Sequence, residues 1–144
     1  MLIRSALLIL LVGLFAAAGF GQSVYTPERG SAERKAILDA LRIPVERELN
    51  QKIIFSADDF NVLANWAFVS GKPQSENGGQ PDYSGTKYEE AYSEGAFDDN
   101  FFALLKRTNG RWRVVTFAIG CTDVCYSDWA KRFKAPNLIL PYSE

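Results

Sequence analysis

The sequence predicts a single α+β domain in which an N-terminal helix packs on an antiparallel sheet of about four strands. Apolar residues spaced four apart come first, as on one face of a helix, and segments with two-residue alternation follow. An Asn109-Gly110 pair separates two of these alternating segments, which is typical of a tight hairpin turn. Neighbouring antiparallel strands with a helix on one face form a two-layer sandwich.

Residues 1–21 have the layout of a cleavable secretory signal peptide. Arg4 supplies one positive charge, an uncharged apolar core follows, and small residues precede the polar Gln22. We expect cleavage after Gly21, with cleavage after Gly19 as the second choice. The alternative is an uncleaved membrane anchor, because the apolar stretch approaches the ~18 residues that can span a bilayer. The expected location is therefore the periplasm or the extracellular space, with no stable membrane insertion after cleavage.

Removal of the signal peptide leaves roughly 120 residues, enough for one domain with a modest core. We expect residues 22–30 to form an N-terminal arm and residues 31–144 to form the domain. The formal net charge of -1 gives no overall field that would collect nucleic acid. The chain has no His, the commonest general base near neutral pH and the commonest metal ligand. We therefore expect no metal and no cofactor, and the absence of His makes a non-catalytic role the better interpretation.

The first element of the domain is a helix that begins at Ser31, a residue type that caps helix N-termini. Its apolar residues recur every four positions, at Ile37, Leu41, Val45 and Leu49. Pro44 interrupts this pattern, because it lacks an amide donor and its ring collides with the preceding turn. We expect a kink at Pro44 or two abutting helices.

Two strands follow, the first from Lys52 and the second over residues 66–73, with a turn near residues 63–65. Gly71 and Pro73 favour a strand end beside a sheet edge.

The third and fourth strands, residues 100–107 and 111–120, flank Thr108-Asn109-Gly110. On the fourth strand, strict alternation predicts two faces. One carries Trp112, Val114, Thr116 and Ala118, and the other carries Arg113, Val115, Phe117 and Ile119.

A long polar loop is expected at about residues 74–99, with a helical turn or two within residues 87–94. A short helix over residues 127–133 follows the cysteines and stops at Ala135-Pro136. The loop is acidic, whereas the C-terminal third is basic, so the molecule should carry a charge dipole.

Several short motifs occur in this order along the chain: Trp66-Ala67-Phe68-Val69, Pro73-Gln74, Ala103-Leu104-Leu105-Lys106, Gly110-Arg111-Trp112, Val114-Val115, Gly120 with Thr122-Asp123-Val124, and Trp129. In these motifs, residues 32–130 resemble a largely uncharacterised family of small exported or periplasmic bacterial proteins. The resemblance implies a compact exported domain and no assigned activity. By analogy, the two-layer architecture is cystatin-like or nuclear-transport-factor-2-like. The cysteines are where the chain departs from the family pattern.

Cys121 and Cys125 can pair in the oxidising compartment that an exported chain reaches. A bridge across so short a loop adds only roughly 2 kcal/mol, so its main task is to shape the local turn. A redox role is the weaker alternative, because the spacing is Cys-x-x-x-Cys rather than Cys-x-x-Cys.

Two sets of residues are candidates for binding a partner. The long loop contributes tyrosines, which give large contact area at small entropic cost, and carboxylates for a basic partner: Tyr83, Tyr88, Glu89, Glu90, Tyr92 and Glu94. The hairpin tip contributes cations that suit anionic glycans or phosphates: Arg107, Arg111 and Arg113. For both sets the alternative is an ordinary solvated surface.

Asp123 and Tyr126 form the best acid-base pair in the chain, although both remain weak catalytic candidates and Asp123 is better explained as a capping or turn residue. Aromatic residues could line a cavity between helix and sheet, but packed core is the stronger interpretation for Trp66, Phe68, Trp112, Phe117 and Trp129. The acidic pairs Asp58-Asp59 and Asp98-Asp99 lack the pattern of a calcium loop, so we interpret them as solvated turns.

Three functions remain open. The first is an exported, non-catalytic module that binds a protein or cell-wall component. The second is a pocket protein or small enzyme that binds an apolar ligand and uses an Asp as acid or base. The third is a structural or assembly unit.

Overall fold

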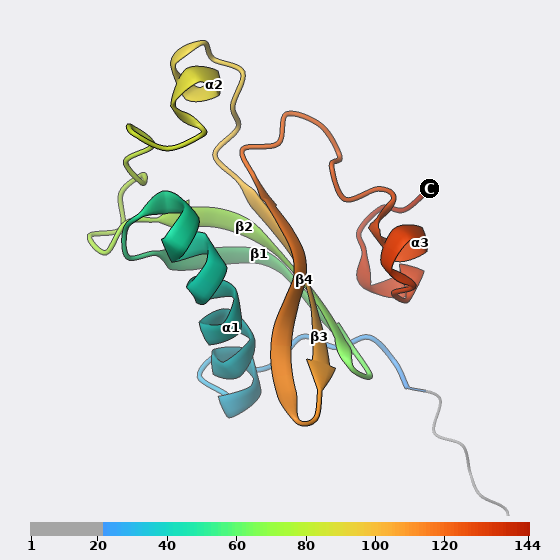
Figure 1. Ribbon diagram of the computed structural model, residues 1–144. Coiled ribbons are helices and arrows are strands. Elements are labelled where there is room, and N and C mark those ends of the chain that lie inside the picture. The colour runs from blue at the N-terminus through green and yellow to red at the C-terminus, as the bar shows by residue number, and fades with distance from the viewer. Residues whose placement is uncertain (1–21) are drawn as a thin grey trace, which may run out of the picture.

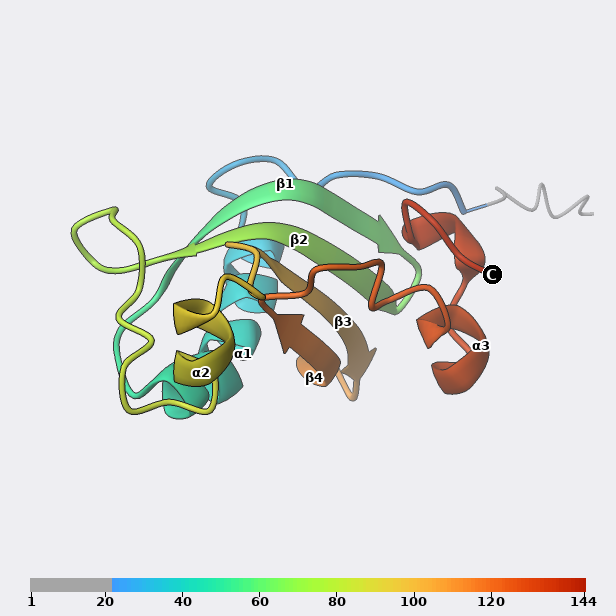
Figure 2. The same cartoon turned by 90° about the horizontal axis from the view of Figure 1, so that it is seen from above.

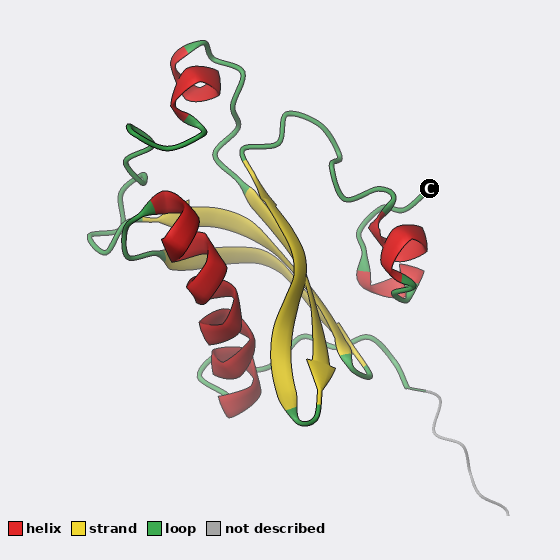
Figure 3. Ribbon diagram, viewed as in Figure 1, coloured by secondary structure: helices red, strands yellow, loops and turns green. Residues whose placement is uncertain are grey.

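The computed structural model describes residues 22–144, so the predicted signal peptide lies outside the described residues. Figures 1 and 3 show the elements in order: α1 (Ala32–Leu49), β1 (Ile54–Leu63), β2 (Trp66–Gln74), α2 (Glu89–Ser93), β3 (Phe101–Thr108), β4 (Arg111–Ile119), α3 (Trp129–Phe133) and the short 3-10 helix η1 (Asn137–Ile139). The predicted α+β class is confirmed, because α1 packs against an open antiparallel sheet with strand order β1-β2-β3-β4. No helix of residues 22–144 is long and apolar enough to cross a bilayer.

Helix α1 is one uninterrupted element of 18 residues, although Pro44 lies inside it. Its start is as predicted, since the Ser31 side chain accepts a hydrogen bond from the Arg34 backbone N–H at 3.2 Å. The helix ends at Asn50, which adopts a left-handed conformation. Division into two helices is therefore wrong. The backbone hydrogen bond that Pro44 cannot donate is offset by the burial of the apolar stripe on both sides of it: Ile37, Leu41, Val45 and Leu49.

The sheet is a meander that contains two tight hairpins, one joining β1 to β2 and the other joining β3 to β4. Thr108 pairs with Arg111 across Asn109 and Gly110, which have φ values of 52° and 74°, so the predicted hairpin is confirmed. The first hairpin turns through two residues between Leu63 and Trp66. Figure 2 shows the strands of this meander bending as they run from one end of the sheet to the other.

Pro73 illustrates how the sheet accommodates a residue without an amide donor. It pairs with Phe55 of β1, but the pairing of β2 with β3 ends at Gly71 and Phe101. Pro73 therefore lies where β2 has become a local edge, as its residue type predicts.

The alternation predicted for β4 fails at a β-bulge. Leu104 pairs with Thr116 and Leu105 pairs with Val114, so Val115 is an extra residue on β4. The bulge changes which residues face α1. Trp112 and Val114 contact the core beneath α1, but beyond the bulge Phe117 and Ile119 do so instead of Thr116 and Ala118.

Both faces of the sheet are covered. The face toward α1 carries the larger cluster, and the opposite face packs against the C-terminal segment, residues 121–144 (Figure 1). The second cluster consists of Leu63, Phe68, Leu104, Tyr126, Trp129, Ala130, Ala135, Ile139 and Leu140. The helix predicted over residues 127–133 corresponds to α3. It begins at Trp129, two residues later than predicted, and Trp129 packs against the sheet.

Candidate functional site

The predicted binding loop is folded around an aromatic cluster. The Tyr83 ring lies 6.3 Å from Tyr88, 5.2 Å from Tyr92 and 4.6 Å from Phe97 between ring centroids. Tyr83 is only 2% exposed, so its ring is part of the core and offers no contact surface. Burial first, and the nearby Asp99 carboxylate second, raise the pKa of the Tyr83 hydroxyl. The sequence analysis predicted a surface position for Tyr83 because the loop around it is polar. In the structure, burial stabilises its aromatic ring instead.

Tyr88 also has a structural role. Its ring is partly buried, and its hydroxyl donates a hydrogen bond to Glu48 of α1. Lys87 forms an ion pair with the same carboxylate at 2.7 Å. Burial and then Glu48 raise the pKa of Tyr88. The loop is therefore attached to the C-terminal half of α1.

The exposed part of the loop is acidic. Glu90 and Glu94 are exposed, as is Glu89, whose carboxylate accepts the Gly85 backbone N–H at 3.0 Å. Tyr92 is 44% exposed and remains available for contact. Of the six loop residues predicted to bind a partner, these four lie on the surface.

The β3–β4 turn carries the opposite charge. Four exposed cations surround it, and we call them the basic tip: Lys106, Arg107, Arg111 and Arg113. The Lys106 ammonium lies 4.9 Å from the Trp66 ring centroid, and the Arg107 guanidinium lies 5.5 Å from that of Trp112. No carboxylate of residues 22–144 forms an ion pair with any of the four. The basic tip thus presents uncompensated positive charge on both faces of a hairpin.

The acidic and basic surfaces are widely separated. Figure 1 places α2 and the β3–β4 turn at opposite ends of the molecule. The acidic surface and the basic tip therefore lie at opposite ends of the molecule, whereas Lys131, Arg132 and Lys134 of the predicted basic third lie on or next to α3.

Asp123 and Tyr126 do not form the predicted acid-base pair. Asp123 is exposed, and its carboxylate accepts the Val124 backbone N–H at 2.7 Å, which is the turn role favoured for it. Tyr126 is buried against Phe68 at 5.0 Å between ring centroids. Burial, and then the charge of Asp59, raise the pKa of Tyr126. We expected the two side chains to act together because they are close in sequence. In the structure, the turn between them leaves Asp123 exposed to solvent and Tyr126 buried against the sheet.

The predicted disulfide joins Cys121 and Cys125, whose Cα atoms lie 6.2 Å apart. The Asn100 side chain holds this loop to the start of β3, since it accepts the Cys121 N–H at 2.9 Å and donates to the Cys121 carbonyl at 2.8 Å. The bridge therefore shapes a turn that is also anchored to the sheet.

The space between α1 and the sheet is filled by side chains. Ile37, Leu41 and Val45 have no exposed surface there. The five aromatic residues suggested for a cavity divide between the two faces: Trp112 and Phe117 contact the α1 cluster, and Trp66, Phe68 and Trp129 the other. They therefore cannot line a single cavity.

The acidic pairs do not come together with other metal-ligating side chains. Asp59 accepts a hydrogen bond from the buried Ser70 hydroxyl at 2.7 Å, and Asp58 is exposed beside it. Within the part of the chain that the structure describes, no group of three or more His, Cys, Asp or Glu side chains could hold a metal ion.

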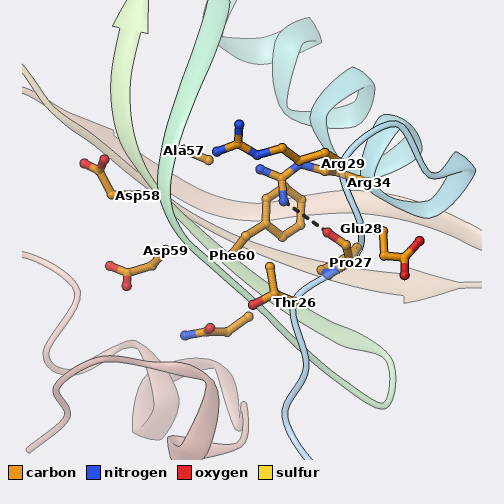
Figure 4. Close-up of a pocket in the computed structure, with 10 residues that line it drawn as sticks. Thr26, Pro27, Glu28, Arg29, Arg34, Ala57, Asp58, Asp59 and Phe60 are labelled. Carbon is orange, nitrogen blue, oxygen red and sulfur yellow. Dashed lines mark hydrogen bonds between the residues drawn. The ribbon is translucent and has the colours of Figure 1, made fainter.

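A pocket of about 400 Å³ lies where the N-terminal arm meets the outer edge of β1 (Figure 4). Arg29 of the arm and Arg34 of α1 line it together with Phe60 of β1. Sequence reasoning did not single out these arginines. No local pattern marks them, because the pocket depends on the arm returning to β1, where Tyr25 and Val62 exchange hydrogen bonds of 3.0 and 2.8 Å.

Fold and surface together define an α+β meander domain with a filled core, an acidic end and a basic end. No protein-family model, curated protein or solved structure matches this chain.

Proposed function

We propose that this protein is an exported, non-catalytic binding module that uses the basic tip to hold an anionic polymer of the cell envelope. The observation that carries the proposal is that four cations, none of them in an ion pair within residues 22–144, gather around one tight hairpin turn. Unpaired cations gathered on one rigid hairpin suit a ligand with closely spaced negative charges.

Other features support a binding role over a catalytic one. The filled core leaves no interior site beneath α1, and Asp123 is exposed whereas Tyr126 is buried against Phe68. The disulfide agrees with residence in an oxidising compartment, which the signal-like residues 1–21 also favour. The acidic surface on α2 lies far from the basic tip, so it does not repel an anionic ligand there.

The test replaces two cations of the basic tip. Arg111→Gln with Arg113→Gln should weaken binding of the purified protein to immobilised polyphosphate or polygalacturonate roughly two- to thirty-fold. This range assumes that each exposed charge contact contributes roughly 0.2–1 kcal/mol. Binding by the unaltered protein should also fall as salt is added. Comparison of the two polymers shows whether phosphate or carboxylate groups are preferred.

Lys131→Gln with Arg132→Gln is the matched control, because it removes the same charge from exposed positions on α3. The control pair should bind as the unaltered protein does. Equal loss in both double variants would show that only net charge matters, and absence of salt-sensitive binding to either polymer would contradict the proposed function.

A further inference from the structure

The pocket beside β1 contains two neighbouring positive charges. The Arg34 guanidinium lies over the Phe60 ring, 4.3 Å from its centroid, and donates one hydrogen bond to the Pro27 carbonyl at 3.2 Å. Its other N–H donors have no partner within residues 22–144. Burial, and then the positive charge of Arg29, lower the pKa of Arg34. The pocket thus brings two guanidinium groups together at an electrostatic cost that an anion would relieve.

No carboxylate of the described chain relieves that cost. Arg29 and Arg34 form no ion pair with any residue of 22–144. Glu28, Asp58 and Asp59 also line the pocket, but Figure 4 shows the side chains of Asp58 and Asp59 on the opposite side of β1 from both guanidinium groups, and that of Glu28 pointing away from them. The face of the pocket that the arginines line is therefore positive.

The same pocket exposes the backbone of an edge strand. Val62 exchanges two hydrogen bonds with Tyr25, so its backbone groups point outward from the sheet. Because such groups alternate along a strand, those of Phe60 also point outward. The arm leaves the edge after Tyr25, and no hydrogen bond from residues 22–144 reaches the outward groups of Phe60. An unpaired donor and acceptor therefore lie next to the two guanidinium groups.

We propose that this pocket binds the C-terminal end of an extended polypeptide. The terminal carboxylate would accept hydrogen bonds from Arg29 and Arg34, and the peptide backbone would pair with Phe60 as a short added strand. A ligand with a carboxylate alone would satisfy the arginines but leave the strand edge unpaired. The volume of about 400 Å³ limits the bound part to a few residues. The aromatic ring of Phe60 and the ring of Pro27 supply an apolar floor.

The experiment compares two peptide pools with the purified, ¹⁵N-labelled protein. Both are N-acetylated tripeptides with randomised side chains, one with a free C-terminal carboxylate and the other with a C-terminal amide. At millimolar concentration the free-acid pool should shift the backbone amide signals of Phe60 and Thr26. Its affinity should exceed that of the amide pool on the order of ten-fold or more, since a hydrogen bond to a charged group is the stronger kind.

Arg29→Gln tests the arginines without disturbing the fold, because Arg29 is exposed and makes no hydrogen bond within residues 22–144. It should weaken binding of the free-acid pool, as should Arg34→Gln. Arg47→Gln is the matched control, an exposed arginine in the last turn of the same helix. It should leave binding unchanged.

Three results would overturn the proposal: equal binding of the acid and amide pools, no shift with either pool, or displacement of the acid pool by an equal concentration of inorganic phosphate. The last result would identify a simple anion site. The basic tip shares no residue with this pocket, so polymer binding and peptide binding can fail independently.

Discussion

Gly120 shows how one residue without a side chain positions a distant segment. Its φ is +76°, and a Cβ atom at this position would lie 2.1 Å from the Phe97 ring. Phe97 in turn packs on Tyr83, at the centre of the aromatic cluster of residues 74–99. The close approach of Phe97 to the Gly120 backbone therefore holds the acidic segment against the sheet.

Gly120→Ala should destabilise the protein by roughly 2–5 kcal/mol, because left-handed backbone strain of about 1–2 kcal/mol adds to overpacking of about 1–3 kcal/mol. Gly110→Ala is the control, since Gly110 has a φ of +74° but no neighbouring atom within 4 Å of the added Cβ. It should cost only the backbone strain. Urea unfolding followed by Trp fluorescence measures both, and equal losses would show that Phe97 does not depend on Gly120.

The buried tyrosines make stability depend on alkaline pH. The pKa values of Tyr83 and Tyr88 are raised above the ordinary value of 10.0, so the folded protein keeps their protons to higher pH than the unfolded chain does. Their contribution is complete below pH 10 and is lost as pH rises from there toward the folded pKa. Each should lower the free energy of unfolding by about 1.4 kcal/mol per pH unit in that window.

Tyr83→Phe and Tyr88→Phe should each remove one such contribution from the slope of stability against pH above pH 10. Tyr142→Phe should leave the slope unchanged, because Tyr142 is 52% exposed. The measurement is urea unfolding at a series of alkaline pH values. An unchanged slope in both buried-site variants would refute the assignment.

At the scale of elements, most of the fold follows from local patterns. The four-residue spacing of α1 and the Asn109-Gly110 turn each depend on neighbours in sequence, and both predictions are confirmed. The bulge at Val115 was missed because its register is determined by pairing with Leu104 and Leu105. Val115 is as apolar as Val114 before it, so alternation of residue types does not reveal the bulge.

Whether a candidate site could be predicted also depends on whether its residues are close in sequence. The three arginines of the basic tip, Arg107, Arg111 and Arg113, were predicted to lie together because a tight turn necessarily brings its flanking residues together. The pocket beside β1 was missed because Arg29 and Arg34 meet Phe60 only through the long-range contact of Tyr25 with Val62. Sequence alone also could not show that Tyr83 is buried, since its burial depends on Phe97 and on the end of α1.

At the scale of the whole molecule, the C-terminal segment makes the sheet a buried middle layer. Trp129 of α3 is 4% exposed and lies 6.5 Å from the Phe68 ring, between centroids. Without the C-terminal segment, the hydrophobic cluster around Phe68 on the sheet face opposite α1 would be exposed to water. The segment is therefore an integral part of the domain.

Trp129→Ala should destabilise the protein by roughly 3–5 kcal/mol, the usual cost of removing a large buried aromatic side chain. Lys131→Ala on the same short helix should change stability by no more than about 0.5 kcal/mol, because Lys131 is exposed. Urea unfolding monitored by circular dichroism provides the comparison. Similar midpoints for the two variants would mean that the C-terminal segment unfolds separately from the sheet.

The strand order β1-β2-β3-β4 also bears on how the chain reaches this structure. Every pairing joins consecutive strands, and two of the three cross turns of only two residues. Hairpin contacts so close in sequence form within about 1–10 μs. We expect the joining of the two finished hairpins across residues 75–100 to be slower, because it closes a longer loop. A chain that emerges N-terminus first from a ribosome or an export channel can complete the first hairpin before the second has emerged.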